Sequence, residues 1–259
     1  MRGGEGPGPA FRGAGGGFLS ARKAPPVKPC DTRIRCFLNV AMSLDGKIAS
    51  SRRDLPRFAG PADRRMMDRL RARADAILVG AGTLRAADFP LRIRAAALRR
   101  RRLSSGRPEQ PLNILLSSSL AVPLNGRFFR SAGTRRLVVT TRDAPSSRVR
   151  ALRGRGEVLV LGRRRVPLPL LMRKLRALGV RHLLLEGGGE TNASFFRRGL
   201  VDEIFLTLCP VIIGGDRSPT PVDGRGLSPE NFLRFRLASL RREGGDIFLH
   251  YRRRRSGPA

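Results

Sequence analysis

The sequence predicts an α/β protein with a mainly parallel central sheet that is flanked by helices and bounded by antiparallel edge strands near the C-terminus. Short, almost wholly apolar segments alternate with segments that have helical spacing of apolar residues. This alternation is typical of strands buried on both faces of a sheet. The last two long apolar segments have no helix between them, which predicts the antiparallel edge.

The expected elements follow one another along the chain. Strands are expected at residues 34–42, 76–80, 112–116, 137–140, 158–161 and 182–185, and longer strands at 201–213 and 235–251. Helices are expected at 61–73, with Pro61 near the start, at 168–178, ended by Gly179, and at 191–198. Residues 1–31 are expected to be a disordered Gly/Pro-rich extension, 32–251 a single domain and 252–259 a basic tail.

The formal net charge of +32 has two interpretations, nucleic-acid binding or compositional drift. We favour drift over a nucleic-acid partner, because arginines are spread over the whole chain and aromatic residues for base stacking are scarce, with one Tyr and no Trp. No apolar segment reaches the roughly 20 residues that a membrane span needs. Three cysteines without a CxxC pair indicate a reducing, cytoplasmic setting and no structural metal.

The strongest local motif is Leu183-Leu-Leu-Glu-Gly-Gly-Gly-Glu-Thr-Asn192, a strand that leads through three glycines into a helix. Glycines allow positive φ and let backbone N–H groups approach a ligand, and a helix N-terminus offers free donors. The motif is therefore either a phosphate cradle or a plain connector, and the residues alone do not decide. It lacks the Rossmann spacing, and Gly46-Lys47 elsewhere in the chain is followed by Ile48 and so does not form a P-loop.

A second segment, Gly80 to Arg94, also follows a short buried strand. Thr83 could cap a short helix or bind a phosphate, although an ordinary capped turn is the better interpretation when the segment is taken alone. Ligands of open α/β sheets bind at the carboxyl ends of the strands. Two such loops therefore strengthen the case for a binding site.

Five features occur in one order: NVAMSLDGKIA at 39–49, the Gly80-Ala-Gly-Thr83 turn, LSSSLAVPL at 116–124, LEGGG at 185–189, and GLVDE at 199–203 followed by PVIIGG at 210–215. Together they resemble the pyrimidine reductase of riboflavin biosynthesis, over about residues 34–251. The resemblance implies a dihydrofolate-reductase-like fold, a homodimer, and NADPH-dependent reduction of a phosphorylated ribosylamino-pyrimidine to its ribitylamino form.

The resemblance also implies residue roles. The residues implied to bind NADPH are Thr83, Asp88, Ser118, Gly187, Gly188, Gly189, Glu190, Thr191 and Asn192. Those implied to bind substrate are Asn39, Arg71, Leu91, Arg94 and Glu186, with arginine facing the ribose phosphate. Asp45 and Lys47 would lie near the reacting sugar as the candidate catalytic residues; the alternatives are a solvated helix face for Arg71 and a turn for Lys47.

The sequence departs from the family pattern at the cofactor. The family usually has Asp-Asp-Pro where this chain has Ala87-Asp88-Phe89, so Asp88 would have to substitute for the missing first carboxylate, and Ser117 replaces a frequent aspartate. The N-terminal residues carry no deaminase zinc ligands, which favours 2,5-diamino-6-ribosylamino-4(3H)-pyrimidinone 5′-phosphate as the substrate. The alternatives are the deaminated 5-amino-6-ribosylamino-uracil phosphate, or another pterin-like substrate of a related reductase.

Overall fold

The structure is a computed structural model that describes residues 33–53 and 58–254. The expected extension at residues 1–31 and the end of the expected basic tail, residues 255–259, lie outside the described residues. Within them, no helix combines the length and the apolar character that a membrane crossing requires.

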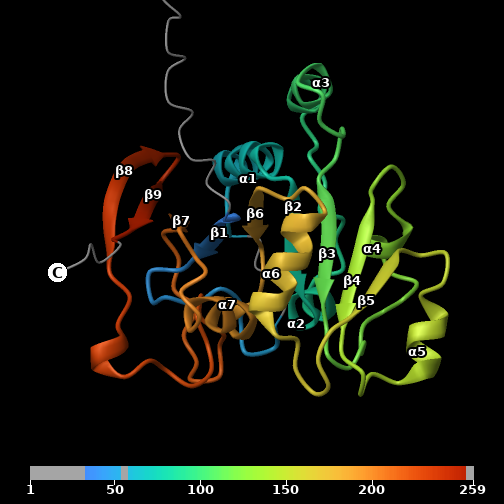
Figure 1. The fold of residues 1–259 in the computed structure, drawn as a ribbon. Coiled ribbons are helices and arrows are strands. Elements are labelled where there is room, and N and C mark those ends of the chain that lie inside the picture. The colour runs from blue at the N-terminus through green and yellow to red at the C-terminus, as the bar shows by residue number, and fades with distance from the viewer. Residues whose placement is uncertain (1–32, 54–57, 255–259) are drawn as a thin grey trace, which may run out of the picture. The chain divides into compact units, whose positions relative to one another are not determined.

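One sheet of nine strands forms the centre of the described chain, in the order β5-β4-β3-β2-β6-β1-β7-β9-β8 (Figure 1). The strands from β5 to β7 in this order are parallel, and β9 and β8 continue the sheet in antiparallel fashion. The bounds are β1 Arg35–Met42, β2 Ala76–Gly80, β3 Leu112–Leu116, β4 Arg136–Thr140, β5 Glu157–Val160, β6 His182–Leu185, β7 Glu203–Leu208, β8 Phe235–Glu243 and β9 Asp246–Arg253. The expected α/β class is confirmed.

Helices cover both faces of the sheet, which explains why the central strands are apolar throughout. On one face, α6 and α7 contribute Leu171, Leu175 and Phe195 to an apolar core (Figure 1). On the other face, Leu70 of α1 and Phe128 of α4 belong to a second core. The helices are α1 Pro61–Arg73, α2 Ala81–Ala86, α3 Ala96–Ser104, α4 Arg127–Arg130, α5 Ser146–Ala151, α6 Leu168–Ala177 and α7 Gly189–Phe196, with a 3₁₀ turn at Pro229–Asn231.

Three expectations about the C-terminal part were wrong. The segment 235–251 is not one strand but the hairpin β8–β9, because Gly244 and Gly245 take positive φ values of 63° and 88° and turn the chain. Strand β7 ends at Leu208 and does not reach residue 213. The basic tail was expected to begin at residue 252, but β9 continues to Arg253.

Candidate functional site

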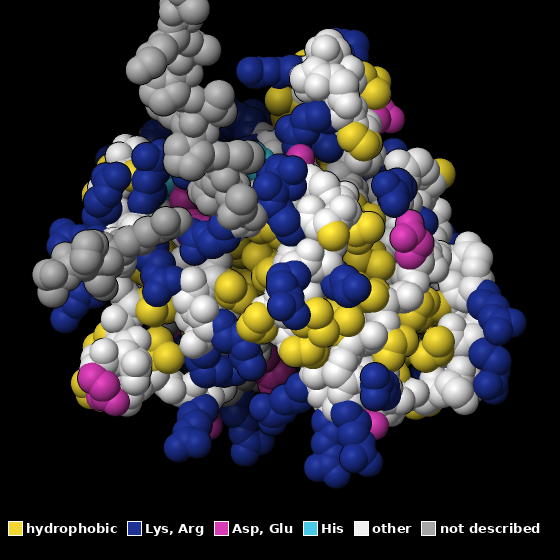
Figure 2. Space-filling model, in the orientation of Figure 1, with side chains coloured by type: hydrophobic (Ala, Val, Ile, Leu, Met, Phe, Trp, Pro, Cys, Tyr) yellow, Lys and Arg dark blue, Asp and Glu magenta, His cyan; other side chains and the backbone are white. Residues whose placement is uncertain are grey.

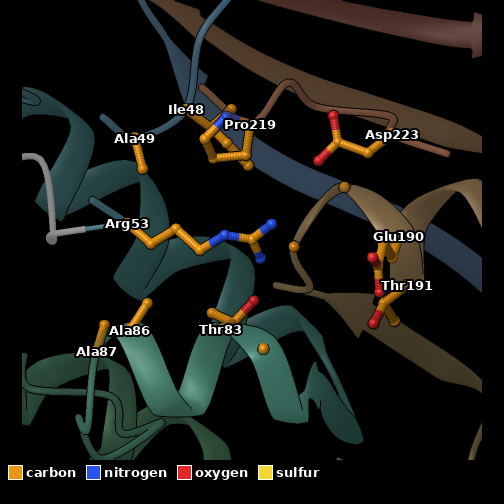
Figure 3. Close-up of a pocket in the computed structure, with 13 residues that line it drawn as sticks. Ile48, Ala49, Arg53, Thr83, Ala86, Ala87, Glu190, Thr191, Pro219 and Asp223 are labelled. Carbon is orange, nitrogen blue, oxygen red and sulfur yellow. The ribbon is translucent and has the colours of Figure 1, made fainter. Parts of the chain in front are cut away.

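Three cavities lie among the loops at the carboxyl ends of the parallel strands and beside helix α1. The glycine-turn cavity, of about 140 Å³, is shown in Figure 3 and is lined by Ile48, Ala49, Arg53, Thr83, Ala86, Ala87, Gly188, Glu190, Pro219 and Asp223, among others. The α1 cavity, of about 820 Å³, is lined by residues of α1 and of the segment 89–94. The α7 cavity, of about 720 Å³, is lined by Leu116, Ser118, Arg165, Ser194, Arg197 and Arg225 in addition to the shared residues Glu190 and Asp223.

The glycine-turn and α7 cavities adjoin, and residues of one loop line the glycine-turn and α1 cavities. Glu190 and Asp223 line both the glycine-turn cavity and the α7 cavity. Ala87 lines the glycine-turn cavity, and Phe89, two residues later, lines the α1 cavity. An extended ligand can therefore run from the α7 cavity past the glycine turn, with a second ligand beside it in the α1 cavity.

The turn Gly187–Gly189 is glycine because its neighbours approach it closely. A Cβ on Gly188 would lie 2.9 Å from Thr83 Oγ1, and one on Gly189 would lie 2.2 Å from a carboxylate oxygen of Asp223. Positive φ is not the reason, since none of the three residues adopts it. The close neighbours are therefore protein side chains, and the expectation that the turn approaches a ligand stays a prediction, whereas the expectation of positive φ is wrong.

Helix α7 begins at Gly189, two residues earlier than expected, with Gly188 as its N-cap. The N–H groups of the first turn have no partner inside the helix, and the positive end of the helix dipole lies at the same place. Glu190 in this turn lines both adjoining cavities, as the sequence motif suggested for a ligand-binding turn. This terminus therefore offers donors to an anionic group such as a phosphate.

Two buried polar atoms at the glycine turn lack a hydrogen-bond partner among the described residues. They are Thr83 Oγ1 and Asn192 Oδ1. Thr83 is not a cap, as one expectation had it, because α2 already begins at Ala81. An unsatisfied buried hydroxyl beside a cavity fits a ligand that completes its hydrogen bonding.

Asn39, Arg71 and Glu186 are brought together on the α1 face of the sheet. Strands β1 and β6 are paired up to Leu38 and Leu185, so Asn39 and Glu186 are the next residues of adjacent strands. Arg71 donates from Nε and Nη2 to the two carboxylate oxygens of Glu186, both at 2.7 Å, and from Nη1 to Arg92 O at 2.8 Å. The bidentate partner of Arg71 in this structure is therefore Glu186.

The remaining substrate candidates lie at or near the α1 cavity. Arg94 lines it, is largely exposed, and has Nε 3.6 Å from a carboxylate oxygen of Asp68. Leu91 is fully buried in the apolar core and is not among the residues lining the cavity. Asn39 Oδ1 is buried without a partner among the described residues.

Two further cofactor candidates are separated from each other. Ser118 lines the α7 cavity. The carboxylate of Asp88 instead accepts hydrogen bonds from the backbone N–H groups of Arg127, at 2.6 Å, and Phe128, at 3.1 Å, at the start of α4. Asp88 thus has a local structural partner, and Ala87 occupies the cavity wall where the family usually has a carboxylate.

Asp45 and Lys47 are outside the linings of the three cavities. The hydroxyl of Ser43 and the backbone N–H groups of Ile213 and Gly214 donate to the Asp45 carboxylate and lower its pKa to about 2. Lys47 interacts with Ser43 through its backbone, which closes the turn after β1. Asp45 therefore connects the turn after β1 to residues 213–214, and neither Asp45 nor Lys47 lines any of the three cavities.

The sequence interpretation missed several of the residues that line these cavities, and two of them show why. Arg53 points its guanidinium group into the glycine-turn cavity, between Thr83 and Pro219 (Figure 3). Asp63, which is 3% exposed, lines the α1 cavity and accepts a hydrogen bond of 2.8 Å from the Thr207 hydroxyl. The available signal was spacing: Asp63, Met67 and Arg71 are four residues apart on one face of α1.

The sequence matches the family described as RibD C-terminal domain over residues 35–249. It is 42% identical over 209 residues to the 2,5-diamino-6-ribosylamino-4(3H)-pyrimidinone 5′-phosphate reductase of Archaeoglobus fulgidus, covering 80% of this chain and 93% of that protein. It is 34% identical over 216 residues to the protein of the same name from Methanothermobacter thermautotrophicus, covering 83% and 96%.

Among solved structures, a pyrimidine reductase-like protein from Corynebacterium diphtheriae is similar to this chain, with a TM-score of 0.76 and 25% identity. The similarity covers 86% of this chain and 93% of that one. The expected dihydrofolate-reductase-like fold is thereby confirmed.

Proposed function

The chain belongs to the RibD C-terminal domain family, and from this we propose that it is an NADPH-dependent reductase of 2,5-diamino-6-ribosylamino-4(3H)-pyrimidinone 5′-phosphate. The reaction converts the ribosylamino group to ribitylamino: C1′ of the opened sugar gains a hydride, its bond to nitrogen becomes single, and a proton balances the charge. A bound reduced nicotinamide supplies the hydride. The chain's own residues bind and orient both molecules.

One observation carries the proposal most strongly. Gly188 and Gly189, with the free donors of α7, line one cavity, and arginines line the α1 cavity, in a chain 42% identical to a reductase of this name. The glycine turn is suited to a dinucleotide, and the arginine-lined cavity is suited to a phosphorylated sugar. Adjacent cavities also allow the two reactants to meet, which is the main contribution of such a site to the rate.

The residues present fit a dinucleotide phosphate. The helix terminus at Gly188 suits the pyrophosphate, and the unsatisfied Thr83 hydroxyl lies at the same cavity. The α7 cavity continues from there and is lined by Arg165, Arg197, Arg198 and Arg225. Arginine clusters recognise phosphate groups, so these residues would hold the 2′-phosphate that distinguishes NADPH from NADH.

This assignment is tested with Arg165→Met and Arg197→Met. Each change removes a charged donor, so kcat/KM for NADPH should fall about 10- to 100-fold while that for NADH changes little. Arg173→Met is the matched control, because Arg173 is exposed on α6 and is not among the lining residues of the cavity. Equal losses for both cofactors would argue against a 2′-phosphate site here.

The α1 cavity suits the phosphorylated substrate. Arg64, Arg92 and Arg127 line it, and their guanidinium groups make no hydrogen bond or ion pair of their own within the described part of the chain. They are therefore available to a phosphate, whereas Arg71 is held by Glu186. We assign phosphate binding to the available arginines and a positioning role to Arg71.

Product analysis tests the reaction itself. With NADPH that carries deuterium at the transferable C4 position, the product should be the ribitylamino compound with deuterium on C1′. If the label is absent from C1′, the proposed hydride transfer is wrong. If only the deaminated compound is turned over, that compound is the substrate in place of the diamino compound. If the protein binds the cofactor but turns over neither compound, it is a related reductase with another substrate.

We also propose that the protein is a cytoplasmic homodimer. Cys36 and Cys209 are buried free thiols, which is in keeping with a reducing compartment. Strand β8 is the last strand of the sheet, and its side chains are exposed along most of its length, including Leu237 and Leu240. An edge of this kind is suited to pairing with a second copy.

A further inference from the structure

The α1 cavity contains one carboxylate among many arginines. Its lining includes six arginines and Asp63, whose side chain is almost completely buried in the cavity wall. Among the described residues, no arginine or lysine side chain lies within ion-pair distance of this carboxylate. Its hydrogen-bond partner is the neutral hydroxyl of Thr207, at 2.8 Å.

The surroundings of Asp63 do not favour a buried negative charge. Burial raises the pKa of Asp63, the Thr207 hydroxyl lowers it, and the nearby carboxylates of Asp246 and Glu186 raise it further. Arg64 opposes this effect to a smaller extent, and the net pKa is above the ordinary value. A buried carboxyl group that lines a cavity and has no ion-pair partner among the described residues is suited to a ligand that supplies hydrogen-bond donors.

The substrate class of the proposed function has a matching edge. A 2-amino-4(3H)-pyrimidinone carries an N3–H and a 2-amino group side by side, both of them donors. A carboxylate accepts two parallel hydrogen bonds of this kind, and each of its oxygens has two lone pairs, so Thr207 can stay bound. After deamination the 2-position is a carbonyl oxygen, which would face a carboxylate oxygen without a hydrogen between them.

We propose that Asp63 binds the N3–H and 2-amino edge of the pyrimidine and thereby selects the diamino substrate over its deaminated 2-oxo counterpart. The inference rests on the proposed function and adds the residue that sets its specificity. The lining agrees: Asp63 and the available Arg64, Arg92 and Arg127 line one cavity, which therefore offers an acceptor for the pyrimidine edge and donors for a phosphate.

The selection is expected to depend on pH. Arg64 and Arg71 of α1, Glu186 after β6, Asp246 of β9 and the Cys209 thiol after β7 are the titratable or charged groups around Asp63. As pH falls through the raised pKa of Asp63, the carboxyl gains a proton that can be donated to a 2-oxo group. The preference for the diamino compound should therefore shrink toward acid pH.

The experiment compares the wild type with Asp63→Asn on the diamino and 2-oxo substrates. The wild type should favour the diamino substrate in kcat/KM by about 100-fold or more, and Asp63→Asn should lose most of this preference by slowing the diamino reaction. The control is Glu157→Gln, because Glu157 is an exposed residue of β5 whose carboxylate pairs with Arg135. This variant should keep the wild-type ratio. An unchanged ratio in Asp63→Asn, or no preference in the wild type, overturns the proposal.

Two further measurements separate this proposal from the proposed function and from a structural role. Calorimetry with the two ribitylamino products, with NADP⁺ bound, reports the same preference without turnover; equal affinities overturn the assignment of Asp63 even if the reductase is active. Asp63→Asn should also resist urea unfolding at neutral pH better than the wild type, because a carboxylate with a raised pKa destabilises the ionised fold. Lower stability would identify Asp63 as a structural residue. Thr207→Val keeps the Asp63 carboxyl group but removes its hydrogen bond from residue 207. This variant should reduce the preference for the diamino substrate less than Asp63→Asn does.

Discussion

Arg71 and Glu186 form a buried ion pair beside the α1 cavity. Their side chains are 4% and 7% exposed, and two parallel hydrogen bonds of 2.7 Å hold the carboxylate in one orientation. Such a pair contributes little net stability, because both charges lose water, but loss of one partner is costly. Its value at this position is the fixed direction of Glu186.

Arg71→Met should therefore destabilise the protein by about 3–5 kcal/mol, because it leaves Glu186 buried and unpaired. The double variant Arg71→Met with Glu186→Gln should recover much of this loss but not the activity. Urea unfolding and kcat/KM of the single and double variants check both statements. Full recovery of kcat/KM in the double variant would show that the pair has no part in the reaction.

Glu203 makes a second buried set of polar contacts, on the α1 side of β7. Arg73 donates to it at 2.6 Å, and His250 Nε2 lies 2.9 Å from its other oxygen. Burial alone would raise the pKa of Glu203, but the hydrogen bonds and charges of Arg73 and His250 outweigh burial and lower it. A carboxyl whose pKa is lowered by folding stabilises the fold above its ordinary pKa and loses this effect as pH falls.

The free energy of unfolding should consequently decrease as pH is lowered from about 6 toward 3, across the ordinary titration range of a carboxyl group. Glu203→Gln should flatten this dependence and cost about 1–3 kcal/mol at neutral pH, since charge-assisted hydrogen bonds are lost. Urea titrations at a series of pH values measure both effects. The same slope in the variant and the wild type would exclude Glu203 as its source.

At the scale of elements, the glycine turn joins β6 to α7 and contacts α2. A Cβ at residue 188 would lie 2.9 Å from Thr83 Oγ1, so the turn or the hydroxyl must move. Gly188→Ala should weaken NADPH binding by about tenfold or more, because the donors of the helix terminus shift relative to the cofactor. Gly226→Ala is the control, since it has open space and no positive φ. Fluorescence titration with NADPH measures the affinity; equal values for the two variants would contradict the assignment.

The sequence predicts those elements whose own residues show the pattern of burial, such as a wholly apolar segment for a buried strand. Strand β2 is buried at all five positions, and its segment is correspondingly apolar. Helix α3 was missed because its sequence is rich in arginine and lacks an apolar stripe. It is held instead by Arg102, which donates to the carbonyl groups of Ala72 and Ala74 near the end of α1.

The site divides in the same way. The Gly187–Gly189 turn was predictable because its chemistry lies in consecutive residues. The role of Asp63 was not, because its partner Thr207 lies 144 positions away and the two meet only when α1 packs on β7. The contacts of Asp88 were not predictable either: the resemblance implies a cofactor role, which stays a prediction, and the structure adds the N–H groups of α4 that bind its carboxylate.

At the scale of the whole molecule, the net charge of +32 comes from basic residues that are spread along the sequence. Figure 2 shows Lys and Arg side chains over the whole visible face, between apolar and uncharged groups. A positive potential of this kind attracts phosphorylated ligands.

The proposed homodimer makes a prediction at this scale. If β8 lies in the interface, Leu240→Lys together with Leu237→Lys should convert the dimer to a monomer, because two charged residues would be buried there. Light scattering of the wild type and the double variant measures the mass. A monomeric wild type, or a double variant that remains a dimer, would contradict an interface at this edge.

NADPH oxidation by the purified chain decides whether the site is a reductase site. With 2,5-diamino-6-ribosylamino-4(3H)-pyrimidinone 5′-phosphate present, the absorbance of the reduced nicotinamide should fall rapidly, with NADPH favoured over NADH and no loss without substrate. A folded protein that binds NADPH but oxidises it with neither the diamino nor the deaminated compound would contradict the proposed function.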